Sequence, residues 1–219
     1  MRVKICGVRG LTDQQVVLAA GADGVGFILG ARHRTEDEVS PQLAAELVAA
    51  LPPFVSSVMV THLQEAATIV GLALRVRPTT LQLHDAIPTG EIEALRAALP
   101  GTKLIQAIHV VNDTAIAEAV ALEPLVDALL LDSRTADRIG GTGQTHDWSI
   151  SRRIVDACAK PVILAGGLTP ANLSSALAAV RPAGVDVNSG VENAAGEKEA
   201  ERVRAFVRLC RAHQLSALA

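Results

Sequence analysis

Short apolar runs alternate with longer segments of helical periodicity along the whole chain. The apolar runs are rich in β-branched residues and predict eight strands, at residues 2–6, 23–29, 55–61, 79–84, 103–109, 126–132, 161–165 and 183–188. Between them, apolar residues recur at three- and four-residue spacing, as in amphipathic helices. The residues expected to cap helix N-termini are Thr12 or Asp13, Ser40 before Pro41, Asp147, and Thr169 before Pro170.

Eight strand–helix units in 219 residues, with no linker or change of composition, predict one domain over residues 1–219. This regular α/β alternation favours a closed parallel (β/α)8 TIM barrel. A doubly wound open sheet is the alternative, but no nucleotide-binding glycine fingerprint follows the first strand. In a barrel, functional side chains are expected at the C-terminal ends of the strands.

Polar residues gather at the ends of several predicted strands. Because residues two apart share a face of a strand, these positions form inward-facing pairs: Lys4 with Cys6, Gln82 with His84, Leu130 with Asp132, and Asp186 with Asn188. The opposite faces stay apolar, as at Val3 and Ile5. This asymmetry indicates a site at one end of the barrel.

Composition excludes several classes of protein. With 49% hydrophobic residues the chain can form a core, and a net charge of -3 offers no basic field for nucleic acid. Three cysteines are too few and too odd for a disulfide framework. The chain contains no apolar run of the ~18 residues that a membrane span needs, and the first predicted strand begins too early to leave room for a signal peptide. We therefore expect a cytoplasmic protein with no nucleic-acid or membrane partner.

Two strand-end residues are candidates for acid–base chemistry. Cys6 is equally well read as a buried small hydrophobe or as a thiolate that Lys4 helps to ionise; Lys4 is alternatively an ion-pair partner of Asp186. Asp132 ends the run Leu129–Leu131, so burial should raise its pKa and let it donate a proton near neutrality. Its alternative role is as a cap or ion-pair partner for the following loop.

Glycines after the last two predicted strands indicate a phosphate site. Backbone N–H groups of these two loops form the usual phosphate site of a barrel, and the residues concerned are Gly166, Gly167, Ser189 and Gly190. The loop 140–145, with Gly141 and Gly143, is glycine-rich but lacks a P-loop ending. The histidines and cysteines show no metal-ligand spacing, so no metal is expected.

The motifs of the chain, taken in order, resemble one known family. They are Lys4-Ile5-Cys6-Gly7, Gly24-Val25-Gly26-Phe27, Leu81-Gln82-Leu83-His84, Leu130-Leu131-Asp132 with Gly140-Gly141-Thr142-Gly143, Asp147-Trp148, Leu164-Ala165-Gly166-Gly167-Leu168 and Val185-Asp186-Val187-Asn188-Ser189-Gly190-Val191-Glu192. Together they are similar to phosphoribosylanthranilate isomerase of tryptophan biosynthesis, over essentially the whole chain.

The resemblance implies an Amadori rearrangement, an intramolecular oxidoreduction of a phosphorylated aminosugar that needs no cofactor. It implies that Asp132 protonates the furanose ring oxygen and that Cys6 removes the proton from the adjacent sugar carbon. The glycine loops match its phosphate grip, to which we add Gly141 and Gly143. The expected substrate-binding residues are Lys4, Arg32, Arg34, Gln82, His84 and Asp186.

One loop departs from the family pattern. Where the family carries an arginine that holds the anthranilate carboxylate, this chain has Asp37, and Arg32 or Arg34 would have to take over after realignment. If neither does, Glu36, Asp37 and Glu38 would face an anionic substrate, which is electrostatically unfavourable. His62, Asp85 and His146 also replace the residues usual in the family. These changes surround the aromatic end of the substrate, so the reaction type is better supported than the amine.

Three alternatives therefore remain beside the isomerase itself. One is a paralogue that rearranges a different aminated sugar phosphate, and another is a non-catalytic barrel that only binds a phosphorylated ligand. The third, an aldolase or epimerase, is disfavoured because no lysine lies at a late strand end and no metal cluster is evident. The sequence is compatible with either a monomer or a homodimer.

Overall fold

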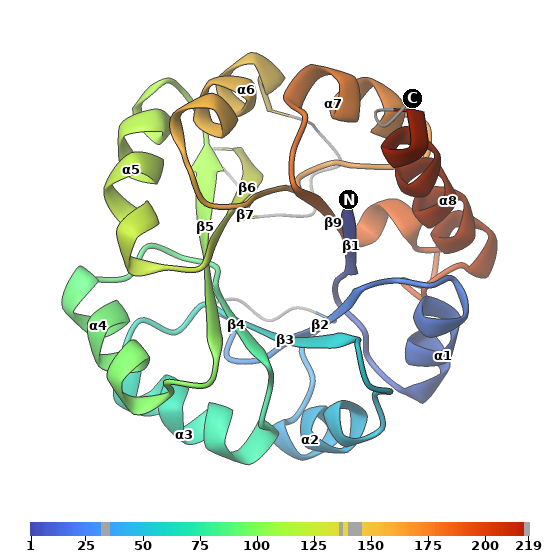
Figure 1. The fold of residues 1–219 in the computed structure, drawn as a ribbon. Helices are drawn as coiled ribbons and strands as arrows, with labels where there is room; N and C mark the ends of the chain where they lie inside the picture. Colours follow the sequence, from blue (N-terminus) through green and yellow to red (C-terminus); the bar gives the residue numbers. More distant parts are fainter. Residues whose placement is uncertain (32–35, 136–137, 140–145, 217–219) are drawn as a thin grey trace.

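A computed structural model describes residues 1–31, 36–135, 138–139 and 146–216. Eight parallel strands close into a barrel, and helices surround it on all sides (Figure 1). The order around the barrel is β1-β2-β3-β4-β5-β6-β8-β9, closed by pairing of β9 with β1. The predicted TIM barrel is confirmed.

All eight predicted strands are present, with shifted ends. They are β1 (Arg2–Ile5), β2 (Gly24–Ile28), β3 (Ser56–Thr61), β4 (Thr80–Leu83), β5 (Lys103–Val110), β6 (Ala128–Thr135), β8 (Val162–Leu164) and β9 (Gly184–Val187). The largest difference is at β6, which runs past the predicted end at residue 132 because β7 (Arg138–Ile139) folds back against it in an antiparallel pair.

The described α-helices cover the outside of the barrel. They are α1 (Leu11–Ala19), α2 (Pro41–Ala49), α3 (Ala66–Val76), α4 (Thr89–Ala98), α5 (Thr114–Leu122), α6 (Trp148–Ala157), α7 (Leu173–Val180) and α8 (Ala200–Ser216). Two short 3-10 turns follow α5 and β9, at η1 (Glu123–Leu125) and η2 (Ser189–Val191). None of the described helices is both long and apolar enough to cross a membrane.

The capping predictions are half right. Ser40 accepts the Leu43 N–H at 3.2 Å, and Asp147 accepts the Ser149 N–H at 2.8 Å, so both cap as expected. The predicted start of α1 at Thr12 or Asp13 is wrong, because the helix begins at Leu11. Asp13 is buried instead and accepts the backbone N–H groups of Arg9 and Lys198.

The predicted start at Thr169 is also wrong. Thr169 and Asn172 exchange hydrogen bonds in a separate turn, and α7 begins only at Leu173.

Alternation along the strands separates two apolar regions. Outward residues such as Ile5 and Leu83 pack against the helices in the main core. Inward residues form small clusters within the barrel, including Val58 and Val60 beside Cys6, and Ala107 with Leu130. Towards the C-terminal ends of the strands the inward positions become polar, and this change of character places the site.

Candidate active site

A buried ion pair joins the first and last strands of the barrel. Lys4 of β1 is in register with Asp186 of β9, and its Nζ donates to Oδ2 at 2.7 Å. Only 8% of each side chain is exposed. Burial opposes the ammonium charge, but the negative charges of Asp186 and Cys6 outweigh it and raise the pKa of Lys4. This is the ion pair that sequence reasoning gave as the alternative role of Lys4.

Cys6 follows β1 and lies inside the barrel, with 6% of its surface exposed. Gly26 of β2 makes room for it, since a Cβ there would lie 2.9 Å from the sulfur. Burial raises the pKa of the thiol, the charge of Asp186 adds to this, and Lys4 opposes it. Lys4 thus favours ionisation of the thiol as expected, but burial outweighs it, so the expectation that the free thiol is driven towards ionisation is wrong in its net direction.

Asp132 lies on the inner face of β6 and is 9% exposed. Burial raises its pKa to about 7, the Ser133 N–H that donates to Oδ1 at 2.7 Å opposes the shift, and the charge of Asp186 adds to it. The expected upward shift is confirmed. At this pKa the carboxyl is substantially protonated near neutrality and can act as an acid.

Gly166, after β8, also serves the acid. Its φ is +80°, and a Cβ there would lie 2.4 Å from the Ser133 nitrogen and 2.8 Å from Asp132 Oδ1. Gly166, which was expected to bind phosphate, thus also leaves room for the Asp132 carboxyl of the neighbouring strand β6.

His84 connects the acid to the next strands. Its Nε2 lies 3.5 Å from Asp132 Oδ2, and its Nδ1 lies 3.3 Å from the Gln82 amide nitrogen. The ring of His62 is 4.8 Å from the His84 ring, and that of His109 is 5.3 Å away, both edge to face. His109 Nε2 also lies 2.9 Å from the His84 carbonyl oxygen.

Sequence reasoning put His62 only among the departures near the aromatic end of the substrate and did not place His109 in the site. The pattern that reveals them is strand alternation, because His62 comes two residues after the inward Val60, and His109 two after the inward Ala107. Despite these rings, no group of three His, Cys, Asp or Glu side chains within the described ranges is arranged to hold a metal ion.

The loops after β8 and β9 meet, as expected of a phosphate site. A Cβ on Gly190 would lie 1.8 Å from the carbonyl oxygen of Leu168, so the two loops touch at this glycine. Gly167 has φ +64°, and Ser189 is exposed at the start of η2. Arg32, Arg34, Gly141 and Gly143 lie outside the described residues.

The acidic second loop is held by its neighbours. Asn188, at the end of β9, donates to Asp37 Oδ2 at 2.8 Å and accepts from the fully buried ammonium of Lys198. Glu38 Oε1 accepts the Gly30 N–H at 2.8 Å. Two of the three carboxylates that raised an electrostatic objection to an anionic substrate therefore have donors of their own.

His146, the remaining departure from the family pattern, lies at the start of α6. Its Nε2 is 2.5 Å from Ser151 Oγ. Burial lowers the pKa of His146 to about 4, against the opposing charge of Asp147, so the ring is neutral at physiological pH.

Comparison with known proteins identifies the family. The family model of N-(5'-phosphoribosyl)anthranilate (PRA) isomerase matches residues 3–209. The PRA isomerase of Haloferax volcanii is 46% identical over 206 residues, covering 94% of this chain and 91% of the relative.

Two solved structures carry the same assignment. A PRA isomerase in complex with reduced 1-(o-carboxyphenylamino)-1-deoxyribulose 5-phosphate has a TM-score of 0.83 and 31% identity, covering 97% of this chain and 99% of that structure. The dimeric PRA isomerase of Thermotoga maritima, solved as generated monomers, has a TM-score of 0.81 and 30% identity, with the same coverage.

These matches extend over nearly the full chain and include the strands that carry Cys6 and Asp132. They support the isomerase over the paralogue, the non-catalytic barrel and the aldolase or epimerase. The chain belongs to the family of N-(5'-phosphoribosyl)anthranilate isomerases, the enzymes that make 1-(2-carboxyphenylamino)-1-deoxyribulose 5-phosphate in tryptophan biosynthesis.

Proposed function

We propose that this chain rearranges N-(5'-phosphoribosyl)anthranilate with Asp132 as general acid and Cys6 as general base. The observation that carries the assignment is the pKa of about 7 at Asp132, because few buried carboxyls can both hold and release a proton at neutral pH. The charges of one ion pair, Lys4 and Asp186, act on both Asp132 and Cys6. The two groups therefore belong to one electrostatic unit.

The acid acts first. Asp132 gives its proton to the furanose ring oxygen as the bond from that oxygen to C1' breaks, leaving an iminium between C1' and the amine nitrogen. This positive charge beside Cys6 favours the thiolate, which burial alone disfavours, and the thiol proton passes to water. Water returns one proton to Asp132 after the reaction, so the protons balance over the cycle. The thiolate then removes the proton from C2', and the electron pair of that C–H bond neutralises the iminium to give an enolamine.

The enolamine needs no cofactor to reach product. C1' gains a proton and the hydroxyl on C2' loses one, giving the ketone. We place the substrate phosphate on the backbone N–H groups of Gly166, Gly167, Ser189 and Gly190, with Gly141 and Gly143 completing the grip.

The experiment is turnover of N-(5'-phosphoribosyl)anthranilate by purified wild-type protein, Asp132→Asn and Cys6→Ala. We expect each substitution to lower kcat by about 10²–10⁴-fold. Cys158→Ala, at the end of α6, is the matched control and should retain activity. Retained activity in either site variant would overturn the assigned roles, and an inactive wild-type protein would overturn the substrate.

We further infer that the protein is a homodimer through the N-terminal end of the barrel. Phe54 is fully exposed there and has φ +70°, a conformation that costs energy for an aromatic residue. It lies at a cavity of about 550 Å³ whose lining includes Arg2, Ser56, Thr80 and Val185. A second copy is the occupant we favour, since the Thermotoga maritima relative is described as dimeric.

The test is the molar mass in solution by light scattering. The wild-type protein should be a dimer and Phe54→Asp a monomer, with kcat changed by less than about twofold because the site lies at the other end of the barrel. Leu74→Asp, on exposed α3, is the control for adding a charge to the surface. A monomeric wild-type protein, or a dimeric Phe54→Asp variant, would overturn the inference.

A further inference from the structure

Three histidines form one wall of the barrel mouth. Alternation places each on the inner face, His62 above Val60, His84 above Gln82, and His109 above Ala107. Their rings stack edge to face in one row, with centroids 4.8 Å and 5.3 Å apart. Side chains of His62 and His84 are 14% and 12% exposed, so they are partly accessible from the mouth.

This wall lies opposite the loops proposed to bind phosphate. In the order of strands around the barrel, β3 is four positions from β8, and β4 is four positions from β9. Figure 1 shows β3 and β4 across the barrel from β9. A sugar phosphate held at the loops after β8 and β9, with its pentose over Asp132 and Cys6, therefore directs its amine substituent towards the histidines.

Charge distinguishes the members of the wall. His62 Nδ1 lies 3.5 Å from Asp85 Oδ2, and this carboxylate is 5% exposed. An imidazole ring donates hydrogen bonds to anions through its N–H groups. His84 instead faces the acid, Asp132. His62 is thus the ring best suited to bind an anion, and His109 flanks the row on its other side.

Residue 37, in the loop after β2, cannot bind an anionic group on the substrate. Asp37 is an acid, and its carboxylate lies against Asn188 at the end of β9, on the phosphate side of the barrel. An anionic group on the amine therefore needs donors other than residue 37. Arg32 and Arg34, the donors expected from the sequence, lie outside the described residues, and the histidine wall supplies described donors where such a group would arrive.

We propose that His62, supported by Asp85, binds the carboxylate of the substrate's aromatic amine and so determines which amine this enzyme accepts, with His109 at the other end of the same histidine wall. The inference rests on the proposed function. In this proposal, imidazoles at the strand ends recognise the carboxylate ortho to the amine. Asp132 and Cys6 still carry out the acid–base steps.

The experiment pairs two substrates with two variants. Wild-type, His62→Asn and His109→Asn proteins are assayed with N-(5'-phosphoribosyl)anthranilate and with N-(5'-phosphoribosyl)aniline, which lacks the carboxylate. We expect His62→Asn to lower kcat/KM for the anthranilate substrate about tenfold or more, mainly through KM. For the aniline substrate the same variant should change kcat/KM by less than about threefold. His109→Asn should show the same selectivity with a smaller effect.

His213→Asn is the matched control, because it makes the same chemical change on α8, away from the site. Calorimetric titration of each variant with the reduced product analogue gives a readout independent of turnover, and affinity should fall for His62→Asn but not for His213→Asn. Asp85→Asn should weaken the same binding, since it removes the charge that supports His62.

Equal losses on both substrates would mean that His62 only maintains the shape of the site, and no loss on either would mean that it does not contact the amine. Either result would overturn the inference. A wild-type protein that turns over neither substrate would instead contradict the proposed function, so the two failures are distinguishable.

Discussion

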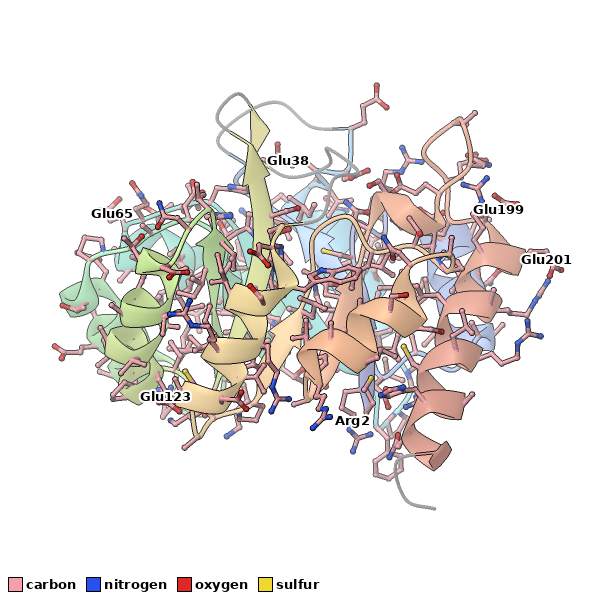
Figure 2. All side chains as sticks on the ribbon, turned by 90° about the horizontal axis from the view of Figure 1, so that it is seen from above. Arg2, Glu38, Glu65, Glu123, Glu199 and Glu201 are labelled. Carbon is pink, nitrogen blue, oxygen red and sulfur yellow. The ribbon has the colours of Figure 1, made fainter. Side chains whose placement is uncertain are left out.

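The two ends of the same eight strands differ in what they bury. At the C-terminal end Lys4, Cys6, Asp132 and Asp186 are all less than 10% exposed, although burying ionisable groups is costly. At the N-terminal end Arg2 is 83% exposed and its partner Asp23 is 19% exposed, and the aromatic ring of Phe54 is fully exposed. Figure 2 shows Glu38 near one end and Arg2 near the other. The Lys4–Asp186 pair is therefore more deeply buried than the Arg2–Asp23 pair, and it lies at the end that carries the proposed chemistry.

The largest contrast is expected between two ion pairs on β1. Lys4→Met should destabilise the fold by about 3–5 kcal/mol, because it leaves Asp186 buried without its cation. Arg2→Met should cost less than about 1 kcal/mol, since this side chain is 83% exposed. Urea unfolding of both variants measures the difference, and equal losses would contradict the contrast between the ends.

A second contrast compares the carboxyl of Asp132, on β6, with that of Asp127, just before β6. The folded pKa of Asp132 is about 7, above the ~3.9 of an unfolded chain, so the folded state binds more protons between these values. Stability is therefore lost as pH rises through that window, by at most roughly 4 kcal/mol. Asp132→Asn should be more stable than wild type at pH 8, and this advantage should disappear near pH 4.

Asp127, before β6, should behave in the opposite way. Burial opposes the shift, but the Leu104 N–H and Arg96 outweigh it and lower the pKa of Asp127. Its contribution to stability is present above the unfolded pKa and is lost as pH falls. Asp127→Asn should therefore be destabilising at pH 8, as measured by thermal unfolding across pH.

The same measurement tests Asp132. If Asp132→Asn is less stable than wild type at pH 8, burial of the ionised Asp132 carboxylate does not destabilise the fold.

The pH dependence of activity follows from the same group. Turnover requires protonated Asp132 and ionised Cys6, and burial raises the pKa of the Cys6 thiol. The value of kcat/KM should therefore rise with pH below about 7 and level off above it, where loss of the Asp132 proton offsets the gain of thiolate. A pH–rate profile tests this, and a kcat/KM that keeps rising about tenfold per pH unit from pH 7 to 9 would contradict the role of Asp132 as the acid.

The smallest effect is expected from two glycines with nearly the same backbone. Gly21 has φ +82° and no atom within 4 Å of the point where a Cβ would lie, whereas Gly166 at φ +80° faces Ser133 and Asp132. Gly21→Ala should lose about 1 kcal/mol from strain, and Gly166→Ala should lose more, because its Cβ would also overlap the Ser133 nitrogen. Only Gly166→Ala should also lower kcat, by about tenfold, because its Cβ displaces the acid. Equal kcat values for the two variants would mean that Gly166 does not help to position Asp132.

Strand alternation predicted much of this molecule because it depends only on local geometry. The pairs Lys4 with Cys6 and Gln82 with His84 do share the inner face, and burial raises the pKa of Asp132 as its apolar strand indicated. The pKa of Cys6 could not be predicted in this way. It depends first on burial inside the closed barrel and then on the charges of Lys4 and Asp186, which lie 182 residues apart in the sequence and meet only when the barrel closes.

The histidine wall shows a different limit. Metal-ligand spacing along the sequence gives no significance to His62 and His109, because they form no motif there. Their significance depends on β3, β4 and β5 being adjacent and in register, which places rings from three strands in one row. The partner of Asp37 could not be predicted for a similar reason, because Asn188 lies 151 residues further along the chain.

The Lys4–Asp186 contact has a consequence for biosynthesis of the enzyme. Asp186 follows Lys4 by 182 residues, so a nascent chain still lacking β9 holds β1 without a neutralising carboxylate. Catalytic activity is therefore expected only once the barrel has closed. We expect a nascent chain without β9 to be inactive. Turnover should first appear when β9 pairs with β1 and closes the barrel.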